Sequence, residues 1–206
     1  MPSIAAHPQR NTIRLQLKQN LILREMPASA FEQLERELEV AECRKGEPLV
    51  RQGATGMEQF FILDGILKRV VINPRGKEMI LRFAAETDMD TSYAAWRLKT
   101  PVPYSIVAVT RARVAKLSMP HWVEFLDRHD AVKQRFEYEV MRLMSEVMAH
   151  TITLHLLDAP GRLSRFVRKH QDLLERLPKK ELASYLNLTP ETLSRLKRIQ
   201  FTAARS

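Results

Sequence analysis

The spacing of apolar and polar residues divides the chain into helical and strand-like stretches. Over residues 12–38 apolar side chains such as Phe31 and Leu34 fall on one helical face. Ser29, with Glu32 three residues later, matches a capping box. This stretch predicts N-terminal helices that serve as scaffold.

Residues 40–118 hold short runs of β-branched and aromatic residues separated by Gly, Pro and Asn. The runs are Leu49-Val50, Phe60 to Leu63, Ile66 to Ile72, Met79 to Phe83, Ser105 to Val109 and Val114 to Leu117. Breaks such as Gln52-Gly53 and Asp64-Gly65 supply the positive φ angles that tight turns need. Because the runs recur at a spacing of roughly ten residues, they predict a compact β-barrel or roll.

No Gly or Pro lies between Pro120 and Pro160, which predicts one long helix with a break near its start. Apolar residues recur there at alternating spacings of four and three, as in two helices packed side by side. This seam consists of Phe136, Val140, Leu143, Val147, His150, Leu154 and Leu157. We expect a second copy of the chain to pack on it, and Met141, Met144 and Met148 to pack back on the β region.

Residues 179–200 carry the pattern of a helix-turn-helix. Asn187 can adopt the left-handed conformation of the turn, and small Ala183 lets the two helices approach closely. Thr189 caps the second helix, and Pro190 takes its first position, where no amide donor is needed. The apolar contacts fall to Leu182, Leu186, Leu188, Leu193 and Leu196.

The second helix of this motif presents a polar face that suits the major groove of DNA. Arg195 can bond bidentately to guanine, and Glu191 can accept a hydrogen bond from cytosine. Lysines at both helices can meet phosphates. The predicted DNA-binding residues are Thr189, Glu191, Thr192, Ser194, Arg195, Arg198, Lys179, Lys180 and Lys197.

Charge supports the same interpretation. The net charge is +9, and residues 162–206 hold eleven Lys and Arg against four Asp and Glu, a net +7. A basic region beside a nearly neutral body indicates a polyanionic partner, and no amphipathic basic helix with aromatic anchors favours a membrane. With 45% apolar residues, no transmembrane run and no signal-like start, we expect a folded cytoplasmic protein.

Cysteine and histidine give no cofactor site. Cys43 is the single cysteine, which excludes an internal disulfide and a four-thiolate cluster. Its neighbours Arg44 and Lys45 could lower its thiol pKa, although packing in a strand is the simpler expectation. The six histidines are scattered, and His150 is expected to be packed or hydrogen-bonded at the helix seam. We expect no metal and no cofactor.

Thr189 to Arg195 resembles the recognition helix of the Crp/Fnr superfamily of bacterial transcription regulators, whose pattern is Glu-Thr-hydrophobic-Ser/Gly-Arg. Phe60 to Lys68 and Gly76-Lys77-Glu78 are similar to that family's cyclic-nucleotide-binding-type β-roll. The resemblance covers residues 20–200.

The resemblance implies an α+β homodimer in which each chain has three parts. These are N-terminal helices with a jelly-roll-like β-roll sensor at 1–119, a dimerisation helix at 120–158 and a helix-turn-helix domain at 159–206. It also implies a palindromic double-stranded operator with TTGA-type half-sites, and RNA polymerase as a partner if the protein activates transcription.

Besides lacking the ligands of its iron–sulfur and haem members, the sequence departs from the family in its phosphate-binding residues and at its C-terminal end. Cyclic-AMP-binding members hold the phosphate with a Gly-Glu and an Arg-Ser/Thr pair, where this chain has Thr91-Ser92 and Tyr104-Ser105. Tyr104 offers only a hydroxyl, so cyclic AMP is not expected to bind, although Arg97 or Lys99 could supply a cation. Only Phe201 to Ser206 follow the recognition helix, so the wing of many relatives is expected to be absent or vestigial.

Two other classes of function compete with a DNA-binding regulator. One is a ligand-binding β-roll module whose helical tail docks on a protein, and the strongly basic tail argues against it. The other is an enzyme, which we do not expect because no nucleophile–base pattern, metal-ligand spacing or phosphate-cradling Gly loop is present.

Overall fold

The computed structural model describes residues 3–203, with side chains to residue 199. A short 3-10 turn at Ile4–Ala6 precedes the helices α1 (Arg10–Lys18) and α2 (Ala28–Glu37). The capping-box prediction is wrong: α2 begins one residue before Ser29, and Pro27 stands at the cap position without a side-chain hydrogen bond. The face containing Phe31 and Leu34 is buried as the periodicity predicts.

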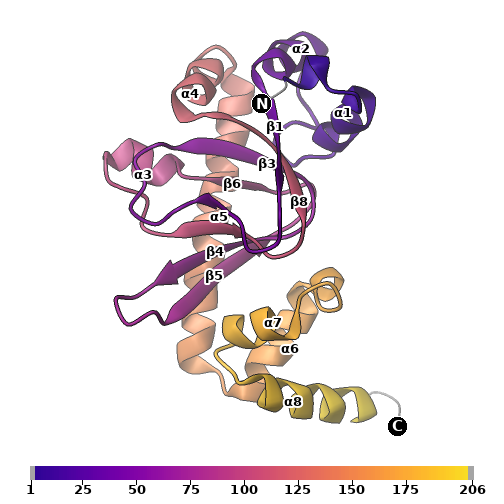
Figure 1. Cartoon of the computed structure of the whole chain (residues 1–206), viewed down its shortest axis with the longest axis vertical. Coiled ribbons are helices and arrows are strands. Elements are labelled where there is room, and N and C mark those ends of the chain that lie inside the picture. Colours follow the sequence, from indigo (N-terminus) through magenta and orange to yellow (C-terminus); the bar gives the residue numbers. More distant parts are fainter. Residues whose placement is uncertain (1–2, 204–206) are drawn as a thin grey trace.

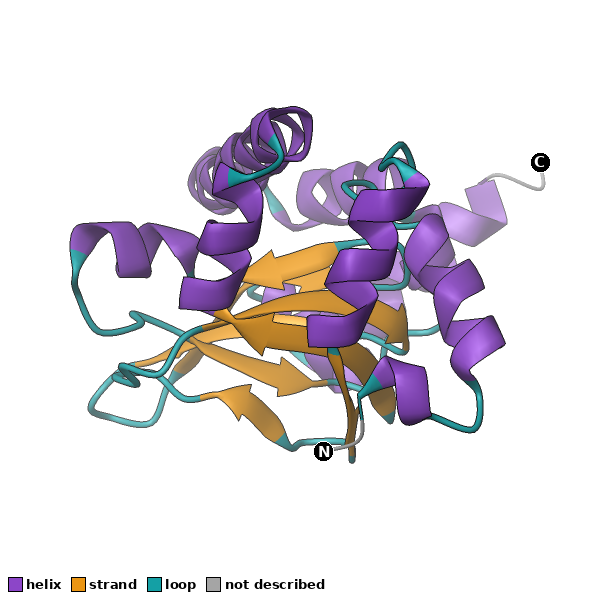
Figure 2. Ribbon diagram, turned by 90° about the horizontal axis from the view of Figure 1, so that it is seen from above, coloured by secondary structure: helices purple, strands orange, loops and turns teal. Residues whose placement is uncertain are grey.

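The β region folds into two four-stranded antiparallel sheets (Figure 2). Their strands are β1 (Glu39–Cys43), β2 (Pro48–Val50), β3 (Glu58–Asp64), β4 (Leu67–Ile72), β5 (Glu78–Ala84), β6 (Met89–Thr91), β7 (Ser105–Ala108) and β8 (Ala112–Ser118). One sheet has the order β1-β8-β3-β6 and the other β2-β7-β4-β5. All six predicted runs are strands. Strand β6 and helix α3 (Tyr93–Leu98) were not predicted, because each is short and β6 buries the polar residues Asp90 and Thr91.

Both faces of strand β3 are buried, which explains its unbroken apolar run. Phe60 and Ile62 point between the two sheets. Phe61 and Leu63 point to the other side, toward the N-terminal helices and Trp122 of α4, where the Phe61 and Trp122 ring centroids lie 5.4 Å apart. A two-residue period therefore places alternate side chains in two separate cores.

Two of the predicted glycine turns differ in how much space surrounds them. Gly65 joins β3 to β4 with a φ of +89°, and Gly76 joins β4 to β5 with a φ of +76°. A Cβ atom at Gly65 would overlap the backbone carbonyl of Arg111, whereas a Cβ at Gly76 would meet nothing within 4 Å. Glycine at position 65 thus satisfies both a backbone angle and a close approach.

The helical region begins with α4 (Met119–Asp127) and continues in the long α5 (Asp130–Leu156). The break near its start is confirmed at Arg128 and His129. Figure 1 shows α5 running along the roll to the C-terminal helices α6 (Ala159–Lys169), α7 (Lys179–Tyr185) and α8 (Pro190–Ala203). Only Leu157 and Asp158 separate α5 from α6. Over the described residues, no helix is both long and apolar enough to cross a membrane.

Candidate nucleic-acid interface

Helices α7 and α8 are joined by the tight turn that the sequence predicts. Asn187 has a φ of +52°, in the left-handed region. The backbone amide of Leu188 donates to the carbonyl of Ala183 at 2.9 Å, which closes the end of α7. Ala183 is fully buried, so the helices meet where the sequence provides its smallest side chain.

The start of α8 is capped as predicted. The amide of Thr192 donates to Oγ1 of Thr189 at 3.2 Å, and Pro190 is the first residue of the helix. The hydroxyls of Thr189 and Thr192 also bond to each other at 3.1 Å. Both threonines therefore fix the start of the helix.

The apolar side of the motif packs on α6 and on the segment that follows it. Leu182, Leu186 and Leu193 are buried together with Leu163 and Phe166 of α6. Leu188 and Leu196 are half-buried against the same cluster. The five predicted leucine contacts are thus confirmed, and this packing fixes which face of α8 looks outward.

That outward face carries the polar residues predicted for it. The side chains of Glu191, Ser194, Arg195 and Arg198 are exposed, as are those of Lys179 and Lys180 at the start of α7. The pKa of Glu191 is lowered, first by its own backbone amide and then by the Thr189 hydroxyl, and the positive charge of Lys179 contributes. Lys179 therefore lies close enough to α8 to belong to the same surface.

Lys197 does not face outward as expected. Its ammonium donates to the carbonyl of Leu174 at 3.4 Å, and burial lowers its pKa. The side chain of Lys197 extends from α8 and is half-buried against the segment before α7. This geometry favours a packing role for Lys197 rather than a phosphate contact.

Several basic residues of the tail also bind within the protein. Arg162 donates to the carbonyl of Leu186 at 2.9 Å and so fastens α6 to the end of α7. Arg176 pairs with Glu86 of the roll at 2.6 Å. The sequence carried no signal for these contacts, because their partners lie 24 and 90 residues away. The net charge of the tail therefore overstates the number of cations available to DNA.

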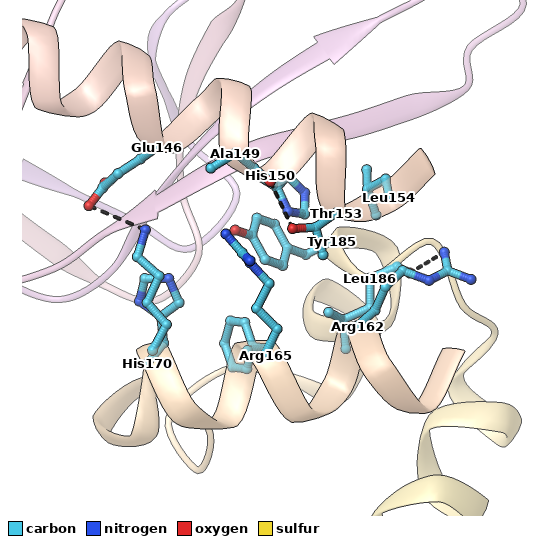
Figure 3. A pocket seen from close by; sticks show the side chains of 12 residues that line it. Glu146, Ala149, His150, Thr153, Leu154, Arg162, Arg165, His170, Tyr185 and Leu186 are labelled. Carbon is cyan, nitrogen blue, oxygen red and sulfur yellow. Dashed lines mark hydrogen bonds and ion pairs between the residues drawn. The ribbon is translucent and has the colours of Figure 1, made fainter. Parts of the chain in front are cut away.

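The helix-turn-helix domain is docked on the β4–β5 face of the roll. Nζ of Lys68 lies 2.8 Å from the Glu181 carboxylate of α7, and the rings of Phe83 and Tyr185 have centroids 5.0 Å apart. Tyr185 also stacks on His150 of α5. Figure 3 shows this junction, in which α5, α6 and α7 meet around a hollow of about 30 Å³. Such a hollow holds roughly one water molecule, so the junction is a packed contact between domains rather than a ligand site.

Helix α5 buries the apolar face that was predicted to bind a second copy, and it exposes the methionine face that was predicted to pack on the β region. Phe136 and Leu143 are buried in the core of their own chain, and Val140 and Val147 pack against that core. His150 is buried against Tyr185, and Leu154 lines the junction with the C-terminal helices. The predicted methionine stripe is the exposed one: Met141 and Met148 are each 63% exposed.

The exchange has a simple origin. A spacing of three and four marks an apolar helical face, but it does not tell whether a partner or the same chain covers that face. In this fold Phe136 and Leu143, from the face predicted to bind a second copy, fill the space beside the roll. Methionine was expected in the core because it packs well there, yet its flexibility also suits an interface.

The residues that stand at the phosphate-binding positions of cyclic-AMP-binding relatives are bonded within the roll. Thr91, Ser92, Tyr104 and Ser105 are all buried. The Tyr104 hydroxyl donates to the carbonyl of Thr91 at 2.8 Å. Ser105 accepts from the backbone amide of Gln52 at 2.9 Å.

The cation nearest to that region is Arg69 of β4, which the sequence reading missed because it lies within an apolar strand. Its guanidinium pairs with Asp90 of β6 and donates to the carbonyl of Thr91 at 3.0 Å. Arg97 and Lys99, the predicted alternatives, are exposed. A buried arginine that already has a carboxylate partner is not free to hold a phosphate.

Cys43 is a packing residue. Its side chain is buried between the sheets, and burial together with the charge of Glu47 raises the pKa of its thiol, against the opposing effect of Lys116. In the part of the chain that the structure describes, no group of three His, Cys, Asp or Glu side chains is placed to hold a metal ion.

Comparison with known proteins places the roll in a family. Residues 40–129 match the family model of the cyclic nucleotide-binding domain. No curated protein matches the chain.

Solved structures resemble most of the chain. FixK2 from Bradyrhizobium japonicum has a TM-score of 0.71 at 14% identity, covering 81% of this chain and 86% of its own. A CooA mutant from Carboxydothermus hydrogenoformans has a TM-score of 0.69 at 16% identity, covering 89% and 85%. The c-di-GMP-responsive global regulator CLP from Xanthomonas campestris has a TM-score of 0.68 at 13% identity, covering 86% and 93%.

The matched domain comprises the strands β1–β8 and reaches the start of α5, and the similarity of shape covers more than four fifths of the chain. Residues 40–129 therefore resemble a cyclic nucleotide-binding domain, and the chain shares the α+β fold of these three solved structures.

Proposed function

We propose that the chain is a transcription regulator that binds double-stranded DNA as a homodimer, with α8 as its recognition helix. The observation that carries the proposal is the outward face of α8. Glu191, Ser194 and Arg195 stand exposed on a helix whose start is capped and whose other side is buried. A rigid helix with an exposed arginine and carboxylate matches the hydrogen-bonding pattern of base edges in the major groove.

Phosphate contacts in this proposal come from residues beside that face. Lys179 and Lys180 are exposed at the start of α7, and Arg198 continues the exposed side of α8. Lys197 is left out, because its ammonium is bound to the carbonyl of Leu174. Fewer phosphate contacts than the sequence suggested should make the salt dependence of binding moderate.

The second copy packs on the exposed apolar face of α5. That face consists of Tyr138, Met141, Met144, Met148, Ile152 and Leu156. With Ser145 included, positions 138, 141, 145, 148 and 152 alternate in spacing by three and four, which is the seam of two packed helices. An apolar stripe of this length on one helix is costly to leave in water.

DNA binding in this proposal does not require cyclic AMP. Arg69 is held by Asp90, and Tyr104 donates its hydroxyl to the backbone of Thr91. A nucleotide phosphate would have to displace a buried ion pair to gain a cation, and breaking such a pair is expensive.

Selection of duplexes from a random pool by the purified full-length protein, followed by binding titrations at two salt concentrations, tests the proposal. We expect an inverted repeat of TTGA-type half-sites whose centres lie about one helical turn, or ~34 Å, apart. Affinity should fall with salt and should not change when millimolar cyclic AMP is added. Enrichment of no common sequence would contradict sequence-specific recognition, and a gain in affinity with the nucleotide would contradict its independence.

A further inference from the structure

The turn between α7 and α8 is bound by a side chain from a third helix. Leu186 follows the last residue of α7, and Asn187 then takes the left-handed conformation. Carbonyl groups at the end of a helix lack amide donors from their own helix and form the negative end of its dipole. Arg162 of α6 meets them: its Nη1 donates to the carbonyl of Leu186 at 2.9 Å (Figure 3) and to that of Asn187 at 3.5 Å.

The same guanidinium also reaches the connection between α5 and α6. Asp158 caps α6, because its carboxylate accepts from the amide of Gly161 at 2.9 Å. Nε of Arg162 donates to the backbone carbonyl of Asp158 at a longer 3.4 Å. One side chain therefore joins the point where α5 gives way to α6 with the point where α7 gives way to α8.

The other contacts of α6 with the helix-turn-helix are mainly apolar. Leu163 and Phe166 are buried in one cluster with Leu182 and Leu186. Apolar packing is not directional, whereas hydrogen bonds from a charged donor fix both distance and angle. A planar guanidinium with five N–H groups can bond to carbonyls on two sides at once, which the single ammonium of a lysine does less well.

The position of the turn determines where α8 begins. Pro190, the first residue of α8, follows Asn187 by three residues. Contacts to base edges need a geometry held within about 0.5 Å, whereas flexible lysines can follow a phosphate through a small displacement. A shift of the turn would therefore disturb Glu191 and Arg195, which are proposed to read bases, more than Lys179, which is proposed to meet phosphate.

We propose that Arg162 is a positioning residue for sequence recognition. It holds the start of α8 in a fixed place relative to the end of α5, so that the recognition helices of two copies meet their half-sites in register. Arg162 touches neither base nor phosphate in this role, although it belongs to the basic tail. The inference rests on the proposed function, because it assigns a role within DNA recognition.

Three variants of the full-length protein separate positioning from charge. Arg162→Met removes the guanidinium and keeps an apolar stem, and Arg162→Lys keeps the charge without the planar group. Arg168→Met is the matched control, because it removes an exposed arginine from the same helix. Each protein is titrated with the selected inverted-repeat duplex and with a scrambled duplex of the same composition, at two salt concentrations.

A measurement without DNA reports on the turn itself. The amide of Leu188 donates to the carbonyl of Ala183 at 2.9 Å and so closes the turn. Hydrogen exchange at this amide is compared between the natural chain and the three variants, and a melting curve shows whether each variant is folded. We expect faster exchange at Leu188 in Arg162→Met and no change in Arg168→Met, because only Arg162 is bonded to the turn.

We expect Arg162→Met to bind the inverted repeat about tenfold more weakly, since hydrogen bonds from a charged donor are lost from the turn. Its affinity for the scrambled duplex and its salt slope should stay unchanged, because no phosphate contact is removed. Arg162→Lys should recover part of the discrimination between the two duplexes. Arg168→Met should keep the full ratio of the two affinities.

Several results would overturn this role. Equal weakening of both duplexes with a lower salt slope would make Arg162 a phosphate contact, and full discrimination by a folded Arg162→Met would make its bonds irrelevant to recognition. Unchanged exchange at Leu188 would show that Arg162 does not hold the turn. If Arg162→Met is unfolded, Arg162→Lys decides, and full discrimination by it would rule out the need for a guanidinium. If the natural chain itself does not distinguish the duplexes, the proposed function fails and this role fails with it.

Discussion

The imidazole of His150 lies flat on the ring of Tyr185, with centroids 3.7 Å apart and planes 2° apart. His150 belongs to the long helix α5, and Tyr185 is the last residue of α7 in the helix-turn-helix. The contact therefore joins the helix proposed to carry the dimer with the domain proposed to bind DNA. Phe83 of the roll also packs on Tyr185, with ring centroids 5.0 Å apart.

This contact should make stability depend on pH. Burial lowers the pKa of His150 to about 4 from an ordinary 6.5, and the nearby charge of Lys169 and His170 adds to that effect. Because the folded pKa lies below the unfolded one, the neutral ring contributes stability above pH 6.5, and this contribution is lost as pH falls toward 4. His150→Phe keeps a flat ring that cannot be protonated.

Urea unfolding at pH 7.5, 6, 5 and 4.5 checks this expectation. The natural chain should lose stability relative to His150→Phe over that range. His170 also has a pKa lowered by burial, but it is present in both proteins and cancels in the comparison. Parallel loss of stability in the two proteins would show that His150 is not the group responsible.

The exposed face of α5 should control association. Met141→Glu with Met148→Glu places like charges on that face, and we expect the variant to sediment as a folded monomer. The matched control is Leu15→Glu with Met79→Glu, which changes two exposed apolar residues outside α5 and should remain a dimer. A dimer that persists after the first pair of changes would rule out this face. Substituting Val140 and Val147 instead would test folding, because both pack on the core.

Arg195 and Lys179 should differ in what they contribute to DNA binding. Arg195→Ala should cost about 1–3 kcal/mol per half-site and relax the preference for one guanine, since its exposed guanidinium is proposed to read a base. Lys179→Ala should weaken all sequences alike and lower the salt slope by about one unit. Titrations on single-base operator variants at two salt concentrations distinguish these effects. If Arg195→Ala weakens every operator equally, Arg195 is a phosphate contact.

The two glycine turns offer a test of close packing. Gly65→Ala and Gly76→Ala both impose a Cβ on a positive φ, which costs about 1–2 kcal/mol. Only Gly65→Ala also drives that Cβ into the carbonyl of Arg111. We expect a clearly larger loss in the free energy of unfolding for Gly65→Ala, measured by urea denaturation. Equal losses would mean that the backbone near Arg111 moves aside at little cost.

Local chemistry was predictable from the sequence wherever neighbours along the chain decide the outcome. The turn at Asn187, the cap at Thr189 and the start of α8 at Pro190 all depend on residues within a few positions of each other. The six apolar runs became strands for the same reason, because alternation and turn residues act locally. The capping box at Ser29 failed because Pro27 takes the cap position and the helix already begins at Ala28.

What the sequence determined by itself is thus the six apolar strands, the long helices and the polar face of α8, since all of these follow from periodicity and short-range hydrogen bonds. The tertiary structure alone decided which face of α5 meets the roll, where Lys197 points, and that Arg69 is paired with Asp90. These outcomes join residues far apart in the chain, and a periodic pattern marks a face as apolar without naming what covers it. Only the packing of the whole fold decides which part of the molecule covers each apolar face.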